Sequence, residues 1–74
     1  MSKSRENFVR LAESRTNKVL KDLDLLSNLS NRSNYAYSEK DVQKIFTVIA
    51  KKLKMVQSKF DAGMKLDKEK PFKL

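Results

Sequence analysis

Apolar residues recur at helical spacing along two long stretches of the chain. In the first stretch, about residues 5–26, one side of a helix would carry Phe8, Leu11, Ala12, Val19, Leu23 and Leu26. Arg15 falls on this side as well, where its aliphatic stem can cover apolar surface. Ser4 stands where an N-cap hydroxyl belongs. This stretch predicts an amphipathic helix.

The second stretch, about residues 39–62, has a longer stripe and clearer ends. Its stripe consists of Val42, Ile45, Phe46, Ile49, Leu53, Val56 and Phe60. Ser38 and Asp41 have the spacing of a short capping box, and Tyr37 and Val42 that of a hydrophobic staple. Gly63 is placed to end the helix in a left-handed C-cap.

The segments outside these stretches are polar. Residues 27–38 are rich in residues that favour turns, namely Asn28, Ser30, Asn31, Ser33 and Asn34. Leu29, Tyr35 and Tyr37 provide apolar anchors, which predict an ordered loop. Residues 64–74 are charged and contain Pro71, which predicts a flexible basic tail.

The expected fold is all-α: an antiparallel two-helix hairpin over residues 1–63, with or without a short third element. Phe8, Leu23, Leu26, Ile45, Ile49, Leu53, Val56 and Phe60 are the core candidates. A bare hairpin has a single seam, and a chain of 74 residues is marginal as a lone folding unit. We therefore expect dimerisation or docking on a partner to complete the core.

The composition argues against catalysis. The chain has no His and no Cys, which removes the commonest general base and the commonest zinc ligands. A single Gly cannot build a nucleotide-binding loop. Asp22 and Asp24 are two residues apart and do not share a helix face. We expect no enzyme activity, no catalytic residue, no metal and no cofactor.

The net charge of +8 favours nucleic acid or another polyanion as a partner. The candidate nucleic-acid contacts are the basic residues that point away from the two stripes or lie in the loop. They are Lys44, Lys51, Lys52, Lys59, Arg32, Arg10 and Lys18. The competing interpretation of the same residues is an ordinary solvated helix surface.

Several apolar residues lie off the main stripes or in the loop, and these predict a second contact surface. The candidate partner-binding residues are Leu20, Leu25, Val48, Met55 and Tyr35. Isolated exposed apolar residues are nevertheless common on protein surfaces. Tyr35 and Tyr37 near Arg32 are also compatible with base stacking, although packing of the loop and of the helix start is the stronger interpretation.

The sequence shows no apolar segment of the kind that targets or spans a membrane. Residues 1–5 lead directly into charged sequence, and no apolar run approaches the roughly 20 residues of a spanning helix. We expect a cytoplasmic protein that makes no membrane contact.

Parts of the sequence resemble a family of small proteins carried on bacterial plasmids, phages and integrative elements. The resemblance is carried by residues 10–18, the block Asn28-Leu29-Ser30-Asn31, Tyr35-Ala36-Tyr37-Ser38 and residues 41–46. Most of the family has no assigned activity. A better understood protein of this kind accompanies the A-family DNA polymerase of staphylococcal cassette chromosomes. That protein lets the polymerase start chains without a primer.

The resemblance implies a non-catalytic accessory subunit that binds a mobile-element DNA polymerase or another replication enzyme and supports primer synthesis or replication. Two alternatives remain open at this point. The first is a homodimeric DNA-binding regulator or relaxosome component, which would bind duplex DNA unaided. The second is an inhibitor of a host protein, for which affinity for DNA would be incidental.

Overall fold

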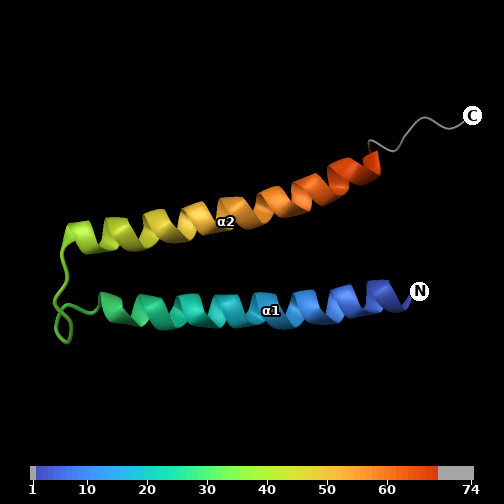
Figure 1. Cartoon of the computed structure of the whole chain (residues 1–74). Helices are drawn as coiled ribbons and strands as arrows, with labels where there is room; N and C mark the ends of the chain where they lie inside the picture. The colour runs from blue at the N-terminus through green and yellow to red at the C-terminus, as the bar shows by residue number, and fades with distance from the viewer. Residues whose placement is uncertain (1, 69–74) are drawn as a thin grey trace, which may run out of the picture. The chain divides into compact units, whose positions relative to one another are not determined.

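The computed structural model describes residues 2–68, and the side chains of residues 2–65. Figure 1 shows helix α1 (Lys3–Ser27) and helix α2 (Glu39–Lys68), and the 3-10 helix η1 (Asn28–Ser30) lies between them in the chain. Over the described residues there is no strand, so the all-α class with two main helices is confirmed. The chain divides into two structural units, Met1–Ala36 and Tyr37–Leu74.

Helix α1 begins two residues earlier than Ser4 as N-cap would require. Ser2 has extended backbone angles, and its hydroxyl accepts a hydrogen bond from the Arg5 amide at 3.1 Å. The Ser2 carbonyl accepts from the Glu6 amide at 3.1 Å, which starts the helical ladder. Ser4 as the N-cap is therefore wrong, because Ser2 already satisfies the exposed amides of the first turn.

Helix α1 ends in short polar hydrogen bonds without a glycine. The Ser27 hydroxyl donates to the Asp24 carbonyl at 2.7 Å, and Asn28 keeps right-handed helical angles. The chain therefore tightens directly into η1, which is the short third element.

Asn31 organises the turn that follows η1. Its side-chain oxygen accepts from the Ser33 amide at 2.9 Å. Its carbonyl accepts from the amides of Asn34 and Tyr35 at 3.1 and 3.0 Å. An Asn is suited to this position because its side chain can replace a backbone acceptor in a turn.

Helix α2 starts at the predicted capping box. The Ser38 amide donates to the Asp41 carboxylate at 2.9 Å, and the Asp41 amide donates to the Ser38 hydroxyl at 3.1 Å. These reciprocal bonds satisfy two amides that the helix start would otherwise leave unpaired. Tyr37 and Val42, on either side of the box, are both half-buried, as a staple pair should be.

Helix α2 does not end at Gly63. It continues to Lys68, and Gly63 lacks the positive φ of a left-handed cap. The prediction that the helix ends at residue 62 is therefore wrong. The prediction of a flexible tail from residue 64 is wrong for residues 64–68, which are helical. A glycine permits a left-handed cap but does not impose one, and the residues after it are compatible with helix. The rest of the predicted tail, residues 69–74, lies outside the described residues.

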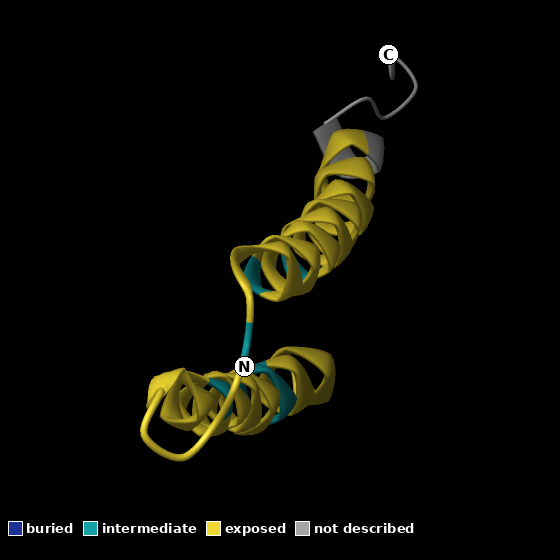
Figure 2. Cartoon of the chain, turned by 90° about the vertical axis from the view of Figure 1, so that its left-hand side faces the viewer, coloured by how far each residue is buried: buried dark blue, intermediate teal, exposed yellow. Residues whose placement is uncertain are grey.

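Neither unit has a closed apolar core. No described side chain is buried, as the absence of dark blue in Figure 2 shows. Of the core candidates, Leu26 and Ile49 are half-buried. The others are exposed, namely Phe8, Leu23, Ile45, Leu53, Val56 and Phe60. Apolar stripes of this length are stable in water only when they are covered, so the helices need further packing.

Candidate interaction surface on α2

The continuous register of α2 sorts its side chains into bands, because successive residues rotate by roughly 100° around a helix. One band is the apolar seam, which comprises Val42, Ile45, Phe46, Ile49, Leu53, Val56 and Phe60. From Val42 to Phe60 the alternate spacing of four and three residues keeps the seam on one side. The seam spans about 100° of the helix circumference.

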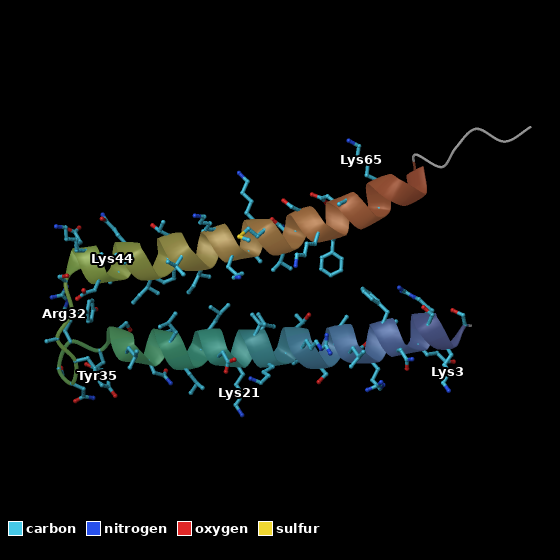
Figure 3. The ribbon with its side chains drawn as sticks, in the orientation of Figure 1. Lys3, Lys21, Arg32, Tyr35, Lys44 and Lys65 are labelled. Atoms are coloured by element: carbon cyan, nitrogen blue, oxygen red, sulfur yellow. The ribbon has the colours of Figure 1, made fainter. Side chains whose placement is uncertain are left out.

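The side opposite the seam carries the lysine band, which we define as Lys40, Lys44, Lys51, Lys54 and Lys65. These residues lie within about 80° of one another on the helical register. Figure 3 shows Lys44 near the start of α2 and Lys65 near its end. Thr47, Ser58 and Ala62 lie among them in the same sector. The lysine band is therefore a mainly basic and polar surface, in which Ala62 is a small apolar residue near the end of the helix.

Acidic residues of α2 are kept away from the middle of the helix. Glu39 and Asp41 lie in the first turn, where the helix dipole favours negative charge. Asp61 follows Phe60, and no acid occurs between Val42 and Phe60. The central part of the lysine band thus has no carboxylate on its own helix to compensate it.

A narrow apolar ridge, Val48 and Met55, lies between the lysine band and the seam. The Val48 side chain is 67% exposed and that of Met55 is 51% exposed. Their spacing of seven residues places them on nearly the same line along α2. Lys52 and Lys59 lie between this ridge and the seam.

The basic residues of α1 have acids as neighbours. Lys18 lies 3.6 Å from Asp22, an exposed pair one turn apart that contributes little to stability. Lys3 and Lys21 project from the same side of α1 in Figure 3, and the register places Arg10 in the same row. Glu6, Glu13 and Asp24 lie only about 60° from that row. The polar side of α1 is therefore mixed in charge.

The remaining candidate contact residues lie in the first unit, Met1–Ala36. Leu20 and Leu25 are both exposed, but their positions on α1 differ by about 140°, so they do not form one surface. Arg32 and Tyr35 lie in the segment that follows η1, and Tyr35 is exposed. The aromatic Tyr35 therefore stays available for contact with another molecule.

The predicted candidates thus separate into two groups. Helix α2 brings together Lys44, Lys51, Lys52, Lys59, Val48 and Met55. Arg10, Lys18, Leu20, Leu25, Arg32 and Tyr35 belong to the other unit. Sequence reasoning missed Lys40, Lys54 and Lys65. The register that Lys40 and Lys54 share with Lys44 and Lys51 was the available signal, and Lys65 joins them because α2 continues past residue 62.

Neither a protein-family model, nor a curated protein, nor a solved structure matches this chain. Within the described part of the chain, no group of three or more potential ligand side chains is placed to hold a metal ion. Over the same residues, neither helix combines the length and apolar character needed to cross a bilayer.

Proposed function

We propose that this chain is a non-catalytic accessory subunit that binds nucleic acid through the lysine band of α2 and supports a replication enzyme. The observation that carries the nucleic-acid part is the band itself, basic along its length and free of acids between Val42 and Phe60. Lysines in a row along a rigid helix can neutralise successive phosphates and release counterions. No comparable acid-free stretch is found among the charges of α1.

The seam supports the protein-binding part of the proposal. It is apolar, continuous and exposed at Phe46, Leu53 and Phe60. Large exposed apolar surfaces mark contacts with other macromolecules. We propose that the helices form an antiparallel hairpin and that a partner protein or a second copy covers the apolar surface that remains.

The resemblance to proteins of bacterial mobile elements, carried by the Asn28–Asn31 block, favours a mobile-element DNA polymerase as the enzyme. The proposed activity would need both a protein-binding face and a basic face near the template strand. The chain offers an apolar seam and a lysine band on one helix.

The nucleic-acid part is tested by fluorescence anisotropy of the full chain with a labelled single-stranded oligonucleotide over a range of salt concentrations. Lys40→Gln with Lys54→Gln removes two band charges and should reduce the salt slope of log affinity by about 1.4 for single-stranded DNA. Lys3→Gln with Lys21→Gln is the matched control on α1, and it should reduce the slope by less. Equal effects of the two double variants would show that net charge alone governs binding.

The accessory part is tested by adding the chain to the A-family polymerase of a staphylococcal cassette element on a primer-free single-stranded template. Stimulated primer synthesis and tight complex formation are the expected results. Tight duplex binding by the chain alone, with no effect on the polymerase, would favour the homodimeric regulator instead.

A further inference from the structure

The ridge of Val48 and Met55 is separate from the surface that helix packing uses. The two residues are centred about 120° around α2 from the middle of the seam. A helix packed on the seam covers a stripe of only about 100°. Whichever helix covers Ile49, Leu53 and Val56, the ridge therefore remains outside that contact.

Lysines surround the ridge at the positions that are nearest neighbours on a helix surface. Lys44, Lys51 and Lys52 lie four before, three after and four after Val48. Lys51, Lys52 and Lys59 lie four before, three before and four after Met55. The two remaining neighbour positions are Ile45, which belongs to the seam, and Ser58, so none of the neighbour positions holds an acid. The result is a small apolar centre with a basic rim.

We propose that this ridge docks into an apolar groove of a protein partner whose rim carries Asp and Glu side chains. Apolar contact with the ridge provides the affinity. The carboxylates pair with Lys52 and Lys59, and with Lys44 and Lys51, which also belong to the lysine band. A flexible thioether such as Met55 adapts to the shape of such a groove. The inference rests on the proposed accessory function in one respect, because the partner is the enzyme that the chain accompanies.

Other ligands fit the ridge less well. Phosphates gain nothing from contact with Val48, and the lysine band offers them a surface that is basic and polar from Lys40 to Ser58. An interfacial membrane helix needs a broad apolar face on its lipid side, whereas the ridge is two residues long. Charge and shape together therefore favour an acidic protein groove. They also assign nucleic acid and protein to adjacent sectors of one helix.

The test compares two double variants of the full chain that introduce the same charge. Val48→Asp with Met55→Asp alters the ridge, and Thr47→Asp with Ser58→Asp alters the lysine band one residue away from Val48. Circular dichroism is used first to check that both variants keep the helix content of the parent chain. Each is titrated with the cassette-element polymerase, with a labelled oligo-dT and with phosphatidylglycerol vesicles.

We expect the ridge variant to bind the polymerase about 30-fold more weakly or worse, as for loss of an interface hot spot. Its affinity for oligo-dT should fall by less than that of the band variant, and the band variant should lose much less of its polymerase affinity than the ridge variant. Unchanged polymerase binding by the ridge variant would overturn the proposal. Parallel losses in both variants, or a ridge effect confined to vesicles, would overturn it as well.

If the parent chain does not bind this polymerase, the proposed function is refuted. The docking proposal for the ridge is then tested by a separate experiment. Benzoylphenylalanine placed at residue 48 in bacterial cells, with residue 47 as control, then maps what touches the ridge. Cross-links from residue 48 to an apolar segment flanked by carboxylates would support the proposal. Cross-links to a basic surface, or an equal yield from residue 47, would refute it.

Discussion

Gly63 lies inside helix α2, and the helix continues beyond it to Lys68. Its position near the end of the apolar stripe favours a left-handed cap, yet it lies inside α2 without a positive φ. A Cβ added at Gly63 would meet no atom within 4 Å. The backbone there is ordinary helix, so what glycine adds is only greater freedom in the unfolded chain.

Replacing Gly63 by Ala should therefore stabilise the end of α2 by about 0.5–1 kcal/mol. The gain is measured as slower amide exchange of residues 60–66 and as a higher thermal midpoint. Were Gly63 instead a left-handed cap in solution, the same substitution would lower both quantities. The sign of the change decides between the two structures.

At the scale of the element, α2 carries two apolar surfaces with different roles. The seam is long and continuous, and it needs to be covered for the helix to persist. The ridge is short and lies among lysines, so it costs little when exposed. Val56 lies in the seam and Val48 lies in the ridge. The same substitution, valine to alanine, can therefore be made in each surface and its effect on stability compared.

We expect Val56→Ala to destabilise the folded chain by about 1–2 kcal/mol, since it removes methyl groups from a packed surface. Val48→Ala should be neutral or slightly stabilising, because Ala has the higher helix propensity. Thermal melts of the two variants, followed by circular dichroism, make the comparison. Equal shifts in both variants would mean that α2 is not packed along its seam.

Much of the local structure could be predicted from sequence, whereas the arrangement of the surface could only be predicted in part. The box at Ser38 and Asp41 was predictable because its hydrogen bonds lie within three residues. The earlier start at Ser2 was missed because Ser2 and Ser4 offer the same cap chemistry two residues apart. Lys40 and Lys54 could have been predicted, because the expected helix over residues 39–62 already places them on the same side as Lys44 and Lys51. Lys65 could not, because it lies beyond the expected end of that helix.

At the scale of the whole molecule, we expect association to support folding, because neither unit buries its apolar stripe by itself. No described side chain is buried, and a chain of 74 residues has little other means of offsetting its conformational entropy. The net charge of +8 adds repulsion between copies, so we expect apolar contact to drive any association between them.

The thermal midpoint and helix content of the pure chain should therefore rise with protein concentration, because association stabilises by mass action. Added salt should strengthen this effect by screening repulsion between copies. Circular dichroism over a hundredfold range of concentration, with light scattering for mass, measures both. A midpoint independent of concentration in a monomeric sample would contradict this expectation.

The uneven placement of charge along α2 also has a consequence for kinetics. Glu39 and Asp41 stand in its first turn, and lysines dominate from Lys44 onward. Over the length of the helix these full charges outweigh the half-charges of the backbone dipole. An approaching polyanion therefore exerts a torque that turns the amino-terminal end of α2 away, within the roughly 8 Å over which such fields persist at physiological salt. The direction in which α2 lies along a strand would then be chosen before any side chain touches it.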